Sequence, residues 1–389
     1  MSAPTVSPAP TASTTAPDAP AGLRGVVVTT TELGDVRGEE GFFHYRQYSA
    51  VDLARTRTVE DVWFLLHRGH LPSVVELAAF QAEVAPLRVL PPALVDALPV
   101  LAAAGGSPLA GLRTALSLLG AAEGVRPVLD LSPEQRAADA LRVCAVVPTV
   151  LAALHRTRAG LPPVAPRDDL DAAANWLWML TGVEAPEAHV RAVRRYLVAT
   201  VDHGFNASTF TARVVASTGA DVVAAVVAAL GAFSGPLHGG APDRALDALG
   251  EIGHPDRAAA WVHEQLAAGR RVMGFGHAVY RTLDPRSVLL RETALELGGD
   301  LAELAVAVEE RVVAALAEAK PGRALHANVE YYAGVVMATC GLAPELFTPT
   351  FATSRVVGWC AHVLEQAEDP RIIRPSARYT GPAAPVPVP

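Results

Sequence analysis

The sequence contains few cysteines, and they form no recognisable pattern. Cys144, Cys340 and Cys360 are the three among 389 residues, and no CxxC pair occurs. This spacing excludes a disulfide framework, argues against a structural zinc site and fits a reducing cytoplasm. Basic residues are also sparse, 32 against 40 acidic ones, and they are scattered rather than clustered. With a formal net charge of −8, the composition gives no reason to expect nucleic-acid binding.

Long apolar segments are lacking as well. The longest run, VVAAVVAALGAF from Val222, is too short to span a bilayer, so we expect a buried or subunit-interface helix. The N-terminal stretch lacks the basic and apolar regions of a signal peptide. A cytoplasmic protein without a membrane partner is therefore predicted. Ala, Pro, Ser and Thr dominate residues 1–21, and residues 380–389 are similar, so both are predicted to be disordered tails.

Helical patterns dominate the rest of the chain. One helix is expected after Thr58, an N-cap residue with Asp61 three positions later. Another is expected after Ser132, where Gln135 completes a capping box and Pro148 should kink the helix without ending it. Further helices are predicted at 169–181, 186–199, 207–232, 256–269, 286–297, 301–319 and 355–366.

Strand signals are confined to the region near the N-terminus. GVVVTTTEL at 25–33 and GFFHYRQY at 41–48 are rich in β-branched and aromatic residues. They predict a small hairpin in a protein whose architecture is otherwise mostly α.

Twelve histidines are present, and for six of them a surface or core role is expected by name. These are His67, His70, His155, His254, His263 and His362.

Three other histidines lie in more unusual surroundings. His238 is bracketed by glycines in GPLHGG, and His277 follows two glycines in GFGHAVYRTLDPR, where Arg281 and Arg286 come next. His203 precedes a helix whose N-terminus favours an anion. Glycines allow sharp turns and close approach of a ligand, and arginines supply bidentate geometry for carboxylates. Together these segments predict a site for a dicarboxylate.

Glu330 lies among aromatic and small residues in HANVEYYAG. A solvated helix edge is the ordinary explanation for a single glutamate. The alternative is a general base in a partly dry pocket.

Other kinds of site find little support in the sequence. Gaps of 35 and 39 residues separate the three histidines, and no HExxH motif occurs, so a metal site is not indicated. GFGHAV is not a GxGxxG motif, and no Walker sequence appears. The GxSxG turn of an acyl-enzyme nucleophile is absent.

These segments together resemble the citrate synthase family, in the family's order and from about Gly22 to Tyr379. The segments that carry the resemblance are GLRGVVVTTTELGDVRGEEGFFHYRQYSAVDLA, EDVWFLLHRGHLP, DHGFNASTFTARVVAST, GPLHGGA, GFGHAVYRTLDPR, NVEYYAG and RVVGWCAHVLEQ with IIRP. Three departures stand out: Gln47 where a glycine is more usual, Pro242 and Asp243 where the family more often has Asn and Glu, and Glu330 where it most often has an aspartate.

The resemblance implies an all-α homodimer with two domains. The large domain would comprise residues 22–240 and 344–379, and the small domain would be an insertion at about 241–343. Closure of the small domain over the substrates would exclude water.

The resemblance also implies condensation of oxaloacetate with acetyl-CoA, without a metal or redox cofactor. His238, His277 and Glu330 would be catalytic, and Arg281 would contact the phosphates of CoA. The residues that would bind oxaloacetate are His203, Arg286, Arg355 and, from the partner subunit, Arg374.

Two further hypotheses remain open at the level of the sequence. A 2-methylcitrate synthase would use propionyl-CoA, and one extra methylene in an apolar pocket decides only about 1–3 kcal/mol. A non-catalytic paralogue that binds oxaloacetate or CoA is the third hypothesis, which rests on the glutamate at position 330.

Overall fold

The computed structural model describes residues 18–236, 238, 242–277, 279–323, 325–382, 385 and 387, without the side chains of Pro242 and Asp243. Most of the two predicted disordered tails lies outside the described residues. A short 3₁₀ helix, η1 (Ala21–Leu23), begins at the last residue of the predicted N-terminal tail.

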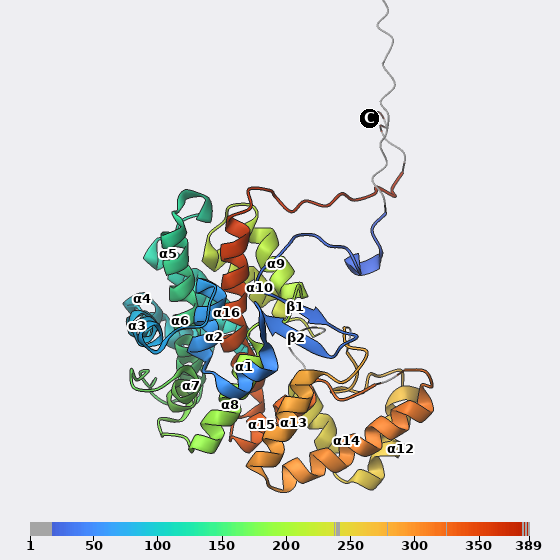
Figure 1. Ribbon diagram of the computed structural model, residues 1–389. Helices are drawn as coiled ribbons and strands as arrows, with labels where there is room; N and C mark the ends of the chain where they lie inside the picture. The colour runs from blue at the N-terminus through green and yellow to red at the C-terminus, as the bar shows by residue number, and fades with distance from the viewer. Residues whose placement is uncertain are drawn as a thin grey trace, which may run out of the picture.

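The described chain is dominated by α-helices, which confirms the predicted all-α class (Figure 1). The helices are α1 (Ala50–Thr56), α2 (Val59–Arg68), α3 (Val74–Val84), α4 (Pro92–Ala103), α5 (Pro108–Glu123), α6 (Pro133–Arg158), α7 (Ala172–Thr181), α8 (Glu187–Thr200), α9 (Ala207–Ala216), α10 (Val222–Phe233), α11 (Pro242–Ile252), α12 (Ala258–Ala267), α13 (Pro285–Leu297), α14 (Asp300–Ala319), α15 (Val329–Thr339) and α16 (Phe347–Ala367).

Both N-caps expected from the sequence are present, and each forms a capping box. The Asp61 N–H donates to Thr58 Oγ1 over 3.1 Å, and the Thr58 N–H donates to Asp61 Oδ2 over 2.9 Å. Ser132 and Gln135 make the equivalent pair at the start of α6. Helix α6 then runs through Pro148 as one element, as predicted.

Two helix predictions need correction. The segment 207–232 was expected to be one helix, but it forms α9 and α10 with a break at 217–221. Gly219 has a φ of +81°, and the Asp221 carboxylate accepts the Ala224 N–H over 2.8 Å, so a new helix starts there. The helix predicted at 355–366 begins earlier, at Phe347. Pro349 lies in its first turn, where a missing N–H breaks no intrahelical bond.

The sheet differs from the predicted hairpin. It has three antiparallel strands in the order β1 (Gly34–Arg37), β2 (Phe42–Tyr45) and β3 (Tyr48–Ser49). The prediction of strand at 41–48 was correct for β2, but the prediction at 25–33 was wrong, since that segment has no regular secondary structure. Its β-branched residues favour extended backbone, but a strand also needs a partner. Val27 is 84% exposed, so this segment has no packed neighbour on that side.

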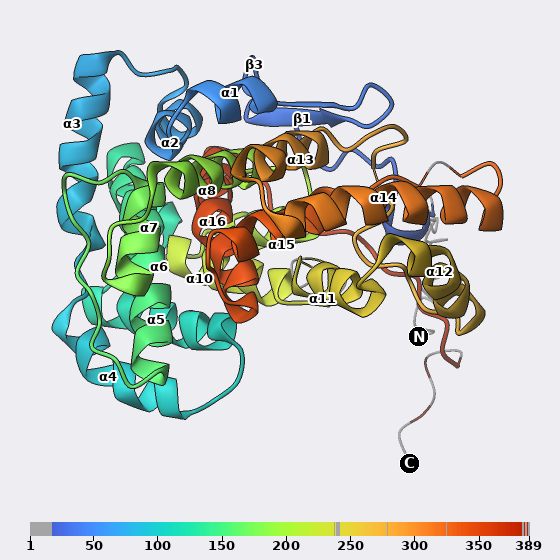
Figure 2. The same ribbon diagram turned by 90° about the horizontal axis from the view of Figure 1, so that it is seen from below.

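Helix α16 lies at the centre of the molecule and forms much of its core (Figure 1). It contacts α2, α6, α8, α9 and α10. Helices α12 and α14 pack against each other, as do α13 and α15, and they make up the gold and orange group in Figures 1 and 2. This group falls within the predicted small domain at 241–343; the division into two domains stays a prediction.

Two apolar helices belong to the protein core. The predicted burial of α10 is confirmed along most of its length, from Val222 to Phe233. Among the described residues, α6 is long and apolar enough to cross a membrane, but 72% of its apolar window is buried inside the protein. Such burial is typical of a core helix.

Candidate functional site

A single cavity of about 870 Å³ gathers the side chains that the sequence singled out. Its walls come from β1, the turn before α9, the loop at 271–279, and the beginnings of α13 and α15, together with α16. The predicted site residues that line it are His203, His238, His277, Arg286, Glu330 and Arg355. The structure therefore brings together residues that are more than 150 positions apart in the sequence.

His238 lies against the N-terminus of α9. The Ser208 N–H donates to His238 Nε2 over 3.3 Å, and the Ser208 hydroxyl lies 2.8 Å from the same nitrogen. Because Nε2 accepts a backbone N–H, the imidazole carries its proton on Nδ1. Burial lowers the pKa of His238 to about 4, and the charge of Arg355 adds to this effect. The side chain is thus a neutral hydrogen-bond donor at neutral pH.

His277 is positioned by the glycine loop before it. Gly274 and Gly276 have φ values of +81° and +86°, and a Cβ at Gly274 would lie 3.1 Å from the ring of Tyr331. The loop is hydrogen-bonded to the chain segment that leads into α15: the Gly276 N–H donates to the His326 carbonyl, and the Asn328 amide donates to the Gly276 carbonyl. The glycines therefore allow the sharp turn that their sequence pattern suggested, and the two hydrogen bonds connect the loop of His277 to the segment that leads to Glu330.

The ring of His277 has donors facing both of its nitrogens. Nδ1 accepts the N–H groups of Val279 and Tyr280 over 3.0 and 3.1 Å, so the ring proton belongs on Nε2. Nε2 in turn lies 3.2 Å from Arg286 Nη2, which is also a donor. Burial, then the charge of Arg286, lowers the pKa of His277 to about 4. Two donors that converge in this way make a site for an acceptor oxygen.

Arg286 is a buried cation held by its own helix cap. Its Nε and Nη2 donate to the two carboxylate oxygens of Asp284 over 3.0 and 2.8 Å. Asp284 also accepts the N–H of Arg286 as N-cap of α13 and the N–H of Val329 at the start of α15. Burial by itself would raise the pKa of Asp284, but Arg286 holds it below its usual value. Asp284 thus ties Arg286 to the helix that carries Glu330.

Arg355 and His203 complete the charged end of the cavity. Arg355 Nε donates to the Thr200 carbonyl over 2.9 Å, and its guanidinium lies 4.7 Å from the centre of the Phe351 ring. Burial lowers the pKa of Arg355 to about 10, which still leaves it charged at neutral pH. His203 Nε2 lies 2.8 Å from the Tyr280 hydroxyl. Burial and the charge of Arg286 lower the pKa of His203 well below its usual value.

Glu330 lies in the first turn of α15. Asn328 caps this helix by accepting the Glu330 N–H over 3.0 Å. The Glu330 side chain is half-buried and lines the same cavity as His238 and His277. The general-base hypothesis, rather than the solvated helix edge, fits this position.

Two predicted residues lie elsewhere. Arg281 is exposed and is not among the residues that line the cavity; its backbone N–H donates to the Gly38 carbonyl over 3.1 Å. Arg374 lies in the exposed C-terminal segment, along a separate groove that it shares with residues near the N-terminus. The predicted contribution of Arg374 to the site of a partner subunit stays a prediction. The side chains of Pro242 and Asp243, which depart from the family pattern, lie outside the described residues.

Several residues of the site were not predicted. Asp284 and Tyr280 were within a quoted segment, GFGHAVYRTLDPR, but nothing in their spacing showed their partners. Ser208 lies 30 positions before His238 in the sequence, so their hydrogen bond becomes visible only in the folded chain. Three basic residues also line the cavity: Arg271, Lys320 and Arg323. Among the described residues, no group of three His, Cys, Asp or Glu side chains is arranged to hold a metal ion.

Comparison with known proteins gives consistent matches over nearly the whole chain. Residues 22–376 match the family model described as citrate synthase, C-terminal domain. The chain is 38% identical over 365 residues to a citrate synthase of Deinococcus radiodurans, which covers 92% of this chain and 95% of that protein. It is 40% identical over 366 residues to a 2-methylcitrate synthase of Mycobacterium tuberculosis, which covers 94% of this chain and 91% of that protein.

A solved structure extends the comparison to the fold. It is the ternary complex of carboxymethyl coenzyme A and oxaloacetate with citrate synthase from Thermoplasma acidophilum. The TM-score is 0.86 with 28% sequence identity, and the alignment covers 95% of this chain and 98% of that one.

Proposed function

The chain belongs to the citrate synthase family and acts as an acyltransferase that converts an acyl group into an alkyl group on transfer, and we propose that it condenses oxaloacetate with acetyl-CoA through the residues of the cavity. The observation that carries this assignment of residues is the convergence of His238, His277 and Glu330 on one cavity beside two buried arginines. Each residue has a role that its geometry supports.

The charged end of the cavity suits oxaloacetate. Arg286 and Arg355 are buried cations, and their guanidinium groups would donate hydrogen bonds to the carboxylates of a keto-diacid, with Arg286 still paired to Asp284. His277 Nε2 and Arg286 Nη2, two donors 3.2 Å apart, would share the ketone oxygen or a neighbouring carboxylate oxygen. His203 would donate a further hydrogen bond to oxaloacetate, in addition to those from His277 and Arg286. In the free protein the donors His277 Nε2 and Arg286 Nη2 face each other. When oxaloacetate binds, both would donate hydrogen bonds to it instead.

His238 suits the thioester. Its tautomer places a proton on Nδ1, which would donate to the carbonyl oxygen of the acyl group. A neutral donor of this kind stabilises the enol as negative charge develops on that oxygen, without needing a full proton transfer.

Glu330 would remove the proton from the methyl carbon. The C–H electron pair then forms the carbon–carbon double bond of the enolate, whose oxygen accepts a hydrogen bond from His238. In the next step the enolate carbon attacks the ketone carbon of oxaloacetate, and the thioester C=O bond forms again. The ketone oxygen, which accepts a hydrogen bond from His277, takes up one proton to become the hydroxyl of citryl-CoA, which balances the proton that Glu330 removed. Water finally cleaves the thioester of citryl-CoA to give citrate and CoA. This acid–base sequence needs no metal or redox cofactor. We propose that the enzyme uses neither.

The basic rim of the cavity suits the phosphates of CoA. Arg271 and Arg323 are exposed at the cavity, and Lys320 is half-buried beside them. We propose that these three side chains contact the phosphates, in addition to Arg281, whose predicted role rests on the family resemblance. A homodimer in the cytoplasm, with Arg374 of one subunit reaching the oxaloacetate of the other, completes the proposal.

The experiment that tests this function is oxaloacetate-dependent release of free thiol from acyl-CoA by the purified chain. We expect turnover with acetyl-CoA and a higher kcat/KM for acetyl-CoA than for propionyl-CoA. Since one methylene decides about 1–3 kcal/mol, the ratio should lie between about 10 and 200. A clear preference for propionyl-CoA would replace the proposal by 2-methylcitrate synthesis. Tight binding of oxaloacetate without turnover on either thioester would favour the non-catalytic paralogue.

A further inference from the structure

One face of α16 holds the backbone just before His203. Arg355 donates through Nε to the Thr200 carbonyl over 2.9 Å, and one turn later Gly358 packs against Val201. A Cβ at Gly358 would lie 2.3 Å from the Val201 carbonyl oxygen, so the close approach depends on glycine at this position. The helix therefore contacts consecutive residues of the segment that leads into the cavity.

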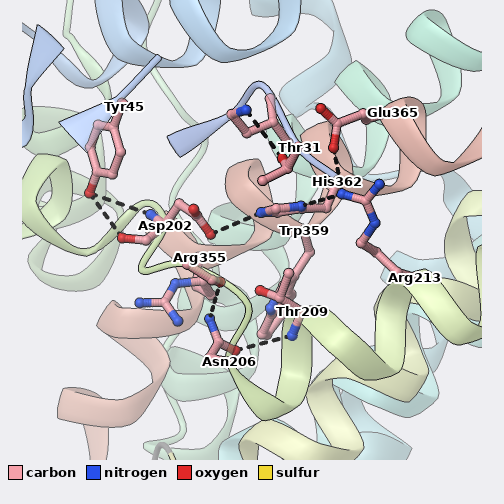
Figure 3. A network of polar contacts seen from close by, with 12 residues as sticks. Thr31, Tyr45, Asp202, Asn206, Thr209, Arg213, Arg355, Trp359, His362 and Glu365 are labelled. Carbon is pink, nitrogen blue, oxygen red and sulfur yellow. Dashed lines mark hydrogen bonds and ion pairs between the residues drawn. The ribbon is translucent and has the colours of Figure 1, made fainter. Parts of the chain in front are cut away.

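His362 makes the next contact along the same face. Its Nε2 lies 3.3 Å from Asp202 Oδ1 (Figure 3), and the two side chains are 2% and 3% exposed. Neither of these two atoms has a hydrogen-bond partner elsewhere among the described residues. A buried carboxylate is unfavourable unless it is compensated, and His362 is the side chain that faces this oxygen of Asp202.

Arg213 determines which nitrogen of His362 faces Asp202. Its Nη1 donates to His362 Nδ1 over 3.0 Å, and its Nε donates to Gln366 Oε1 over 2.9 Å. The charge of Arg213 is balanced by Glu365, whose Oε2 lies 2.5 Å from Nη1. Because an arginine can only donate, His362 Nδ1 is an acceptor and the ring proton lies on Nε2, toward Asp202. Figure 3 shows the contacts that lead from Glu365 through Arg213 and His362 to Asp202.

Asp202 is the residue directly before His203. Its backbone carbonyl also accepts from the Tyr45 hydroxyl over 3.2 Å. Burial alone would raise the pKa of Asp202, but His362 and the charge of Arg355 hold it below its usual value. A charged Asp202 thus fixes the backbone from which His203 enters the cavity, and it lies near the Arg355 guanidinium.

We propose that His362 is a positioning residue for the keto-diacid substrate: with Arg213 behind it, it holds Asp202 so that His203 and Arg355 keep their places in the cavity. This proposal rests on the proposed function, because His203 and Arg355 are assigned there to oxaloacetate. His362 touches no substrate. Its removal should therefore weaken the use of oxaloacetate while it leaves the use of the thioester unchanged.

The test compares three variants by steady-state kinetics. His362→Leu removes both polar contacts of the ring, whereas His362→Gln keeps an acceptor for Arg213 and a donor for Asp202. Thr353→Val is the matched control, since Thr353 is buried on the same helix but its hydroxyl donates within α16, to the Thr350 carbonyl. For His362→Leu we expect the KM for oxaloacetate to rise about 10- to 100-fold, with the KM for acetyl-CoA within about twofold of wild type. His362→Gln should recover much of the loss, and Thr353→Val should show no such difference between the two KM values.

A second measurement makes the test independent of turnover. Hydrogen exchange of the backbone amides at 200–203 should be faster in His362→Leu than in wild type and Thr353→Val. An oxaloacetate KM that is unchanged in His362→Leu would overturn the proposal. If that variant does not fold, an equal rise of both KM values in His362→Gln would overturn it. If the wild type shows no turnover, the proposed function fails, and unchanged exchange at 200–203 would then overturn the role of His362 as well.

Discussion

Replacing Glu330 by glutamine is expected to lower kcat by about 10²- to 10⁴-fold, the usual contribution of a general base. The amide has nearly the shape of the carboxylate but cannot accept the proton of the methyl group. Because Glu330 is assigned to the methyl group of the thioester and the arginines of the same cavity are assigned to oxaloacetate, binding of oxaloacetate should not change. Thiol release and oxaloacetate titration together measure both quantities.

Two comparisons make the Glu330 result specific. Glu330→Asp should be more active than Glu330→Gln, because it retains a carboxylate that accepts the proton, even though a shift of about 1 Å in its position costs on the order of 100-fold. Glu310→Gln changes an exposed glutamate on α14 in the same way and should behave as wild type. Equal activity of Glu330→Gln and Glu310→Gln would show that Glu330 is not the base.

Replacing His238 by alanine is expected to lower kcat by about 10²- to 10³-fold, as the loss of one preorganised donor to a developing oxyanion does. The structure supports His238 as a neutral donor, since Nε2 accepts the Ser208 N–H and burial lowers the pKa of His238 to about 4. The effect should fall on kcat more than on the KM for oxaloacetate, because His238 is assigned to the thioester. Steady-state kinetics with both substrates varied will separate the two.

Ser208→Ala is the matched control for His238. It removes the hydroxyl that lies 2.8 Å from Nε2 but keeps the backbone N–H that determines the tautomer. We expect its kcat to fall by less than about 10-fold. If His238→Ala and Ser208→Ala lost the same activity, the neutral-donor role of His238 would be contradicted.

The parts of the site that could be predicted are those with a local cause. His277 follows glycines that turn the backbone, His238 stands between glycines in the sequence, and Glu330 lies in the first turn of a helix whose N-cap is Asn328. These signals lie within a few residues of the functional side chain. The sequence therefore indicated these residues, and the family order of the segments indicated that they meet.

The parts that could not be predicted depend on contacts across the fold. His362 was expected to have an ordinary core or surface role, and its burial is confirmed, but its partners Asp202 and Arg213 come from other elements. The break between α9 and α10 was also missed, because apolar residues continue on both sides of Gly219 and conceal the turn. Local propensity does not contain the tertiary packing that decides such cases.

The proposed mechanism is tested most directly by a crystal structure of the chain with oxaloacetate and carboxymethyl-CoA, whose carboxylate stands in for the enol of acetyl-CoA. We expect His238 Nδ1 to donate to one oxygen of that carboxylate, with Glu330 about 2.6–3.2 Å from the other. His277 Nε2 should lie at the same distance from the ketone oxygen of oxaloacetate, between Arg286 and Arg355. A complex in which Glu330 points into solvent, or in which the analogue and oxaloacetate occupy separate crevices, would contradict it.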